Sequence, residues 1–195
     1  MKYVRLFANP REERERFLAF ERWWGGGFFF SKPEIVAIVE NLFIGNRLEA
    51  GEVRICPCCY VDLRRIRNPL LIFASRGDDI TPPQQALHWI AQIYPDDQAL
   101  AAAGQRLVYL IHEDAGHLGL FVSADVARRE HRAIISNLDA LAALEPGLYE
   151  MVLKVPPGDG EAIRARFEPR SVHQVAAPHP RPSFQAVRSM SETSV

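Results

Sequence analysis

An aspartate and a histidine, each placed shortly after an apolar run, are the residues of this sequence best suited to acid–base chemistry. Asp78 follows the run from Leu70 to Ala74, and His117 follows the run from Leu107 to Ile111. Such short apolar runs are typical of strands buried on both faces of a parallel sheet. Because the carboxyl ends of neighbouring parallel strands meet at one edge, we expect Asp78 and His117 to lie together there. A carboxylate that orients a base histidine is the second half of a Ser/Cys–His–Asp triad.

The pattern alone leaves a structural interpretation of both residues open. Asp78 stands in turn-forming sequence, where aspartate serves turn geometry as often as chemistry. His117 can be a structural loop histidine, although Gly116 and Gly119 beside it allow close backbone approach at the sheet edge.

The nucleophile that would complete the triad is absent from the sequence. An α/β-hydrolase nucleophile lies in a Gly-x-Ser/Cys-x-Gly elbow and precedes the acid and the histidine in the chain. The 195 residues contain no such pentapeptide. Ser75 has no glycine two residues before it, and the cysteines lack glycines at that spacing. The sequence therefore predicts an acid and a base without their partner.

Two possible metal sites are disfavoured by their spacing. Cys56, Cys58 and Cys59 have no second Cys/His pair at zinc-finger or ribbon spacing, so we favour a cysteine-rich loop. His112 and His117 are five residues apart, whereas two zinc-binding histidines on one helical face are four apart. We expect no metal and no cofactor.

Composition narrows the possible partners and the location. A net charge of −1 gives no reason to expect nucleic acid or an acidic membrane as partner. No apolar run approaches the roughly 18–20 residues of a membrane helix, and the first twenty residues lack a signal-peptide core. Three clustered cysteines do not suggest a spread disulfide framework. We expect a cytoplasmic protein of the α/β class.

Helices and strands that would position the two residues follow from caps and periodicity. We expect a helix after Asn9-Pro10, a second behind the capping box Ser31–Glu34, and a third from Pro82 with Thr81 as its cap. A helix of about twenty residues should begin at Ser123 or Asp125. Two buried strands, 70–74 and 107–111, are followed by a predicted hairpin around residues 156–160 and a disordered tail.

An aromatic cluster surrounds the glycines that end the first long helix. It consists of Trp23, Trp24, Phe28, Phe29 and Phe30. We favour packing, as a buried plug or as a contact to parts of a larger protein, over the lining of an apolar substrate pocket.

Several long stretches of the chain resemble a known family. Phe20-Glu-Arg-Trp-Trp-Gly-Gly26, Ile80-Thr-Pro-Pro-Gln-Gln-Ala-Leu87 and His112-Glu-Asp-Ala-Gly-His-Leu-Gly119 are similar to the motifs of an uncharacterised poly(3-hydroxyalkanoate) synthetase-like family, a domain of unknown function in the α/β-hydrolase superfamily. The resemblance covers about residues 2–155. It implies that Asp78 is the triad acid, that His117 is the triad base, and that the chain is an internal or C-terminal fragment of a longer protein.

The resemblance also implies a domain organisation and a chemistry. By the resemblance, residues 1–50 would form a helical cap and 51–147 the last strands of a partial α/β-hydrolase fold. The local sequence pattern adds a β-hairpin over 148–170 and a disordered tail over 171–195. The chemistry would be acyl transfer or hydrolysis on an ester or thioester substrate, and the chain alone would be inactive. The alternative is a non-catalytic subunit or interaction module that completes a separately encoded hydrolase half or forms a homo-oligomer.

Overall fold

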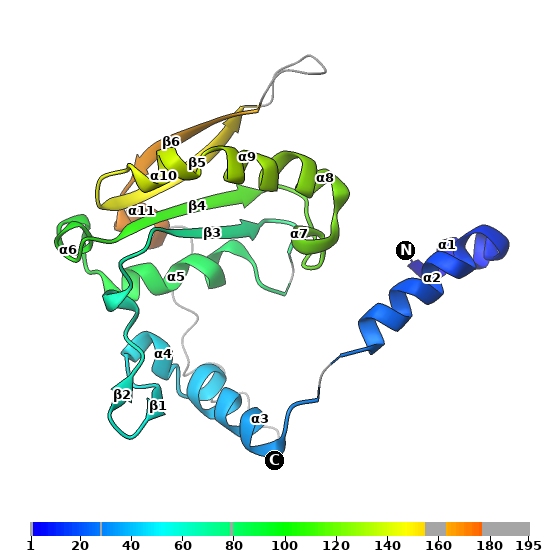
Figure 1. Cartoon of the computed structure of the whole chain (residues 1–195), viewed down its shortest axis with the longest axis horizontal. Coiled ribbons are helices and arrows are strands. Elements are labelled where there is room, and N and C mark those ends of the chain that lie inside the picture. Colours follow the sequence, from blue (N-terminus) through cyan, green and yellow to red (C-terminus); the bar gives the residue numbers. More distant parts are fainter. Residues whose placement is uncertain (1, 28, 79, 155–162, 177–195) are drawn as a thin grey trace. The chain divides into compact units, whose positions relative to one another are not determined.

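A computed structural model describes residues 2–27, 29–78, 80–154 and 163–176 (Figure 1). The chain divides into two compact units, residues 1–46 and residues 47–195. The predicted turn at residues 156–160 and the tail beyond residue 176 lie outside the described residues.

The first unit is helical. It contains α1 (Lys2–Ala8), α2 (Pro10–Gly25), α3 (Lys32–Ile38) and a π-helical turn, η1 (Val39–Ile44). Pro10 opens α2 as predicted, although the side chain of Asn9 makes no capping bond. The predicted capping box is present at α3, where the Ser31 backbone N–H donates to Glu34 Oε2 at 2.7 Å. Both signals act locally, which is why the sequence is sufficient to predict them.

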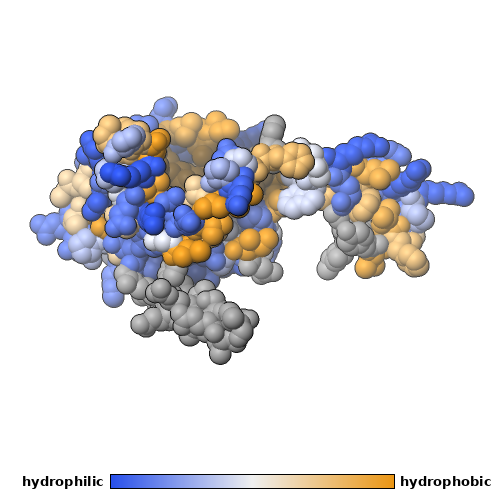
Figure 2. Space-filling model, turned by 90° about the horizontal axis from the view of Figure 1, so that it is seen from below, coloured by the Kyte–Doolittle hydropathy of each residue, from blue (hydrophilic) through white to orange (hydrophobic). Residues whose placement is uncertain are grey.

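Large apolar side chains remain at the surface of this unit. Trp23 and Trp24 are 56% and 58% exposed, and Phe30 is 63% exposed. The rings of Phe20, Trp23 and Trp24 contact one another, with centroids 5.7 to 6.3 Å apart. Figure 2 shows hydrophobic residues gathered on one side of the α1–α2 pair and hydrophilic ones on the other. The predicted buried plug is therefore wrong for the described members of the cluster, and Phe28 lies outside the described residues.

The second unit is built on a mixed four-stranded sheet in the order β3-β4-β5-β6. The strands are β3 (Leu70–Ser75), β4 (Arg106–His112), β5 (Gly147–Lys154) and β6 (Arg164–Arg170). The pairs β3–β4 and β4–β5 are parallel, and β5–β6 is antiparallel. A separate antiparallel pair, β1 (Arg54–Cys56) and β2 (Cys59–Tyr60), precedes the sheet between α4 (Arg47–Ala50) and the 3-10 turn η2 (Leu63–Arg65).

Alternating side chains of the central strand β4 fill two separate cores. Leu107 and Tyr109 pack with α5 (Pro83–Ile93), α6 (Asp97–Ala102) and α11 (Val172–Ala176). Val108 and Leu110 face the other way and pack with α9 (Arg132–Ser136) and α10 (Leu138–Ala142). Helices therefore cover both faces of the sheet, as Figure 1 shows. This arrangement explains why β4 is apolar at successive positions and not at alternate ones.

The structure corrects three details of the predicted architecture. The first strand of the predicted hairpin joins the sheet as a third parallel strand, because Leu148 and Met151 of β5 are each needed by a different core. The long helix after Ser123 is instead α8 (Ala124–Val126), a π-helical turn η3 (Ala127–His131), α9 and α10. Asn137 interrupts it, since its side chain bonds the carbonyl of Ala133 at 2.8 Å.

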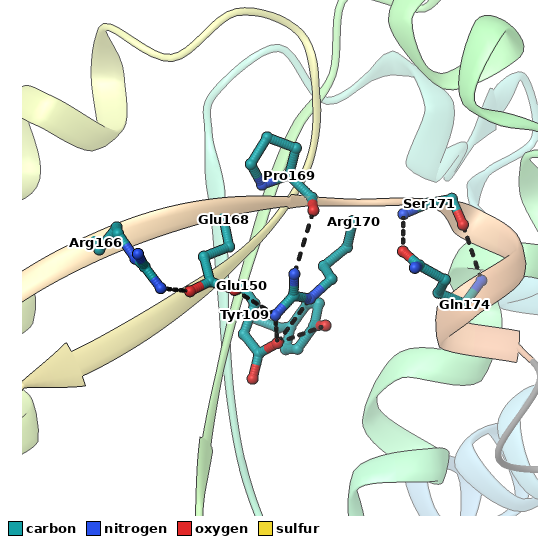
Figure 3. Close-up of polar contacts among 8 residues, drawn as sticks. All are labelled: Tyr109, Glu150, Arg166, Glu168, Pro169, Arg170, Ser171 and Gln174. Atoms are coloured by element: carbon teal, nitrogen blue, oxygen red, sulfur yellow. Dashed lines mark hydrogen bonds and ion pairs between the residues drawn. The ribbon is translucent and has the colours of Figure 1, made fainter.

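The third correction concerns the predicted tail, which begins with an ordered helix. Val172 and Val175 of α11 are buried against α5, and the backbone N–H of Val172 donates to Asp97 Oδ1 at 2.6 Å. At the start of α11, Ser171 and Gln174 exchange two hydrogen bonds of 2.9 and 3.0 Å (Figure 3). The composition of this segment is polar, but two valines three residues apart are enough to dock one helical turn.

A charged network connects β6 to the centre of the sheet. The Arg170 guanidinium donates to Glu150 at 2.9 Å and to Glu168 at 2.6 Å, and the Tyr109 hydroxyl donates to the same Glu150 oxygen (Figure 3). Burial, together with the negative charge of Glu150, raises the pKa of Tyr109 to about 12. The network thus joins three strands without leaving the glutamates unpaired.

The loops that leave β3 and β4 pass in direct contact at the end of the sheet. The backbone N–H of Arg76 donates to the carbonyl of His112 at 2.9 Å, which extends the parallel ladder by one residue. A Cβ on Gly77 would lie 2.7 Å from the carbonyl carbon and oxygen of Asp114. Only glycine fits here, because the neighbouring atoms are backbone and cannot rotate away.

We predict that Gly77→Ala lowers the free energy of unfolding by about 1–3 kcal/mol, the usual range for overpacking. Gly116→Ala is the matched control, because a Cβ there meets no atom within 4 Å. Urea unfolding followed by circular dichroism measures both. Equal stabilities of the two variants would show that the loops can separate without cost.

Candidate functional site

The loop after β3 encloses the carboxylate of Asp78. Its Oδ1 accepts the backbone N–H groups of Ile80 and Thr81, each at 2.9 Å, and its Oδ2 accepts the Thr81 hydroxyl at 2.6 Å. Asp78 is 1% exposed. The prediction that Thr81 caps α5 is wrong: the helix begins after Pro82, and the threonine hydroxyl bonds the carboxylate instead.

His117 completes this arrangement from the loop after β4. Its Nδ1 lies 3.0 Å from Asp78 Oδ2 and 3.0 Å from the Thr81 hydroxyl oxygen. An ionised carboxylate only accepts hydrogen bonds, so the pair requires a proton on Nδ1 and leaves Nε2 as the basic nitrogen. The side chain is 36% exposed, and Nε2 has no hydrogen-bond partner within the described part of the chain. The imidazole is thus held at one end and accessible at the other.

Hydrogen bonding keeps Asp78 ionised despite its burial. Burial by itself raises the pKa of this carboxyl. The hydroxyl and backbone N–H of Thr81, the ring of His117 and the N–H of Ile80 outweigh that effect and hold the pKa of Asp78 well below its usual range. At neutral pH the carboxylate can therefore orient the imidazole and stabilise its protonated form.

A second histidine positions the loop that carries the first. His112, the last residue of β4, accepts the backbone N–H groups of Asp114 and Ala115 on Nδ1, both at 3.0 Å. Its Nε2 lies 3.7 Å from the carboxylate of Glu130, which is only 4% exposed. His112 therefore shapes the turn that leads to His117.

Sequence reasoning missed the roles of Thr81, His112 and Glu130. The sequence does contain a local signal for the role of Thr81. Its hydroxyl follows Asp78 by three residues, a spacing at which the two side chains can bond within one turn. The contact between His112 and Glu130 joins β4 to η3 across a gap of eighteen positions, and no local pattern encodes it.

No serine or cysteine bonds His117 among the residues that the structure describes. Ser75 is fully buried, and its hydroxyl accepts the backbone N–H of Gly77 at 3.2 Å, which is a turn-stabilising role. The cysteines belong to the separate β1–β2 hairpin, where Cys56 and Cys59 form a disulfide and Cys58 is a free thiol. The structure thus assembles two groups of a possible triad, Asp78 and His117.

The lowered pKa of Asp78 makes a pH-dependent contribution to stability that can be measured. A carboxyl with a depressed folded-state pKa stabilises the fold above its unfolded pKa, about 4, and loses that contribution as the pH falls through the folded value. We predict that Asp78→Asn lowers the free energy of unfolding at pH 7. The difference from the unmodified chain should shrink steadily below about pH 4.

Urea unfolding between neutral and acidic pH tests this, with Asp125→Asn at an exposed carboxylate as the control. Thr81→Val removes one donor and should reproduce part of the Asp78→Asn effect. A constant difference between Asp78→Asn and the unmodified chain at all pH values would contradict the assignment.

No helix within the described ranges is both long enough and apolar enough to cross a membrane. No solved structure is significantly similar to the chain.

Comparison with curated proteins gives three relatives. An "Uncharacterized protein in ackA 5'region" of Rhizobium meliloti is 46% identical over 153 residues, which is 78% of this chain and 21% of that protein. "Poly(3-hydroxyalkanoate) polymerase subunit PhaC" of Haloferax mediterranei is 27% identical over 63% of this chain and 23% of its own length. The PhaC subunit of Haloarcula marismortui is 28% identical over 63% of this chain and 24% of its own length. The chain thus spans less than a quarter of each relative.

A family match covers almost the whole chain. The family described as "Protein of unknown function (DUF3141)" matches residues 1–194. Since that span includes both units and both members of the Asp78–His117 pair, the chain belongs to the DUF3141 family, with a distant relationship to poly(3-hydroxyalkanoate) polymerase subunits.

Proposed function

We propose that this chain carries the acid and the base of an acyl-transfer or ester-hydrolysis site in a partial α/β-hydrolase fold. The single observation that carries the proposal is the 3.0 Å contact between His117 Nδ1 and the buried carboxylate of Asp78, with Nε2 accessible. The two residues follow adjacent parallel strands, β3 and β4, which is where an open α/β sheet binds its substrates.

The nucleophile is supplied by a different stretch of polypeptide, as a serine or cysteine on a Gly-x-Ser/Cys-x-Gly elbow. His117 Nε2 takes its proton while the oxygen or sulfur attacks the acyl carbonyl of an ester or thioester. The imidazolium, stabilised by Asp78, then returns the proton to the departing alcohol or thiol as the old acyl bond breaks. Deacylation by water or by a second hydroxyl repeats the cycle.

The relationship to two poly(3-hydroxyalkanoate) polymerase subunits supports a hydroxyacyl substrate. We therefore propose 3-hydroxyacyl esters or thioesters as the substrate class and the cytoplasm as the location. The chain on its own is inactive, because His117 and Asp78 then have no nucleophile to activate and no oxyanion hole to stabilise the developing negative charge.

The test combines the purified chain with a polypeptide that bears the elbow and follows thiol release from a 3-hydroxybutyryl thioester. We expect turnover by the mixture only, and a loss of about 10²–10⁴-fold or more with His117→Ala. His88→Ala is the matched control, since His88 lies on α5 and bonds Gln92. Turnover by the chain alone, or by the mixture with His117→Ala, would refute the proposal.

Nitrogen NMR on the chain alone provides a second readout of the same proposal. The proton of His117 should reside on Nδ1 in the unmodified chain. Asp78→Asn should move it to Nε2, because the asparagine amide then donates to Nδ1. An Nε2–H tautomer in the unmodified chain would remove the basis of the mechanism.

A second candidate function is that of a non-catalytic module that associates with a complementary hydrolase half or with another copy. The exposed aromatic residues of α2 and of the segment after it favour this candidate: Phe29 is fully exposed, and Trp23 and Trp24 are more than half exposed. Surface aromatics in such numbers are typical of contact surfaces.

Analytical ultracentrifugation of the chain, alone and with the elbow-bearing polypeptide, tests this second candidate. We expect association that is weakened by Trp23→Ser/Trp24→Ser and unaffected by Ile135→Ser, an exposed residue of α9. A monomer under both conditions would count against the second candidate. With the elbow-bearing polypeptide present, it would also remove the complex that turnover by the mixture requires.

A further inference from the structure

The β1–β2 hairpin gathers all three cysteines of the chain. Cys56 and Cys59 are cross-strand partners, joined by the turn Pro57-Cys58. They form a disulfide with a Cα–Cα separation of 4.9 Å. The Sγ of Cys58 lies 3.5 Å from Cys56 Sγ and 3.9 Å from Cys59 Sγ, so all three sulfur atoms lie within 4.8 Å of one another.

These distances are close to those of a metal–thiolate site. With metal–sulfur bonds of about 2.3 Å, trigonal or tetrahedral coordination requires sulfur atoms about 3.8–4.0 Å apart. The two distances from Cys58 Sγ already lie near this range. Only Cys56 and Cys59 must separate, and once their disulfide is reduced, rotation about the side-chain bonds is sufficient.

The composition of the site selects the kind of ion. Thiolates bind soft cations, chiefly Cu⁺ and Zn²⁺. In the described ranges, the cluster consists of these three sulfur ligands and contains no carboxylate or imidazole. Three sulfurs saturate a three-coordinate Cu⁺, whereas Zn²⁺ would take a solvent molecule or an external thiol in its fourth position. Cys58 and Cys59 are exposed, so an ion reaches them without any opening of the fold. Pro57 restricts the turn and thereby lowers the cost of ordering the ligands.

We propose that the reduced hairpin binds one thiophilic d¹⁰ cation, Cu⁺ or Zn²⁺, through the Sγ atoms of Cys56, Cys58 and Cys59, and that oxidation to the Cys56–Cys59 disulfide closes the site. A dithiol reductant opens it: two electrons and two protons convert the disulfide into two thiols, and the reductant becomes a disulfide. Metal binding then releases the thiol protons.

The proposed site differs from the expectation drawn from the spacing of the cysteines, which favours a cysteine-rich loop without a metal. That expectation rests on the lack of a second, distant Cys/His pair. A second pair is unnecessary for a three-sulfur site, because Cys58, in the turn, lies beside the two strand cysteines. The site is also independent of the proposed function, since neither Asp78 nor His117 contributes to it.

The test titrates the reduced chain with Cu⁺ and, separately, with Zn²⁺, each against a colorimetric chelator of known affinity. X-ray absorption then counts the ligands. We expect one ion per chain, three sulfur neighbours at about 2.3 Å, and no binding by the oxidised or the alkylated chain. Comparison of the affinities of the reduced chain for Cu⁺ and for Zn²⁺ then shows which of the two ions the site prefers.

Single substitutions establish which sulfurs take part. Cys58→Ser leaves the strand pair intact and should lower the affinity by about tenfold or more while reducing the sulfur count to two. Cys56→Ser should do the same and also abolish the sensitivity to oxidation. Failure of the reduced chain to bind either ion, equal binding by the oxidised chain, or an unchanged sulfur count in Cys58→Ser would each overturn the proposal. Circular dichroism confirms that each variant is folded.

Discussion

One buried carboxylate holds together the loops that follow β3 and β4. Asp78 receives four hydrogen-bond donors: two backbone amides, the Thr81 hydroxyl and the His117 ring. Three of the four come from the next three residues of its own loop, so the turn would close around the carboxylate even without the histidine. The fourth donor ties that turn to a loop of a different strand. The Asp78 carboxylate is therefore held in place by its own loop, and this carboxylate in turn orients the His117 ring.

The close contact of the two loops depends on packing that is equally constrained. Gly77 lies against the backbone of Asp114, and His112 fixes the amides of Asp114 and Ala115. Displacement of one loop at this contact would move the other, because Gly77 lies against backbone atoms of Asp114 that cannot rotate away. This rigidity is what the proposed acid–base role of Asp78 and His117 requires, since the geometry of such a pair has to be set before the reaction and not during it.

Sequence reasoning succeeds where a local signal decides the structure. Two apolar runs predict β3 and β4, and the common edge of parallel strands predicts that Asp78 and His117 meet. Prediction from the sequence fails where contacts between residues far apart in the chain determine the structure. Residues 149–154 alternate only in part, and nothing local indicates that β5 joins β4; the two cores on either side of the sheet require it. Capping is the usual role of a threonine before proline, but at Thr81 the carboxylate of Asp78 competes for the hydroxyl.

The two edge strands of the sheet, β3 and β6, differ in how readily each could pair with a further strand. In β6, Arg164, Arg166, Glu168, Pro169 and Arg170 leave only two apolar residues, and charges and proline of this kind discourage pairing with a further strand. In β3, the five residues from Leu70 to Ala74 are all apolar, and β4 is its one hydrogen-bonded neighbour among the described strands. Growth of the sheet is therefore chemically permitted at β3 and opposed at β6. A strand added in parallel at β3 would end beside Asp78, so the edge open to extension is also the one nearest the Asp78–His117 pair.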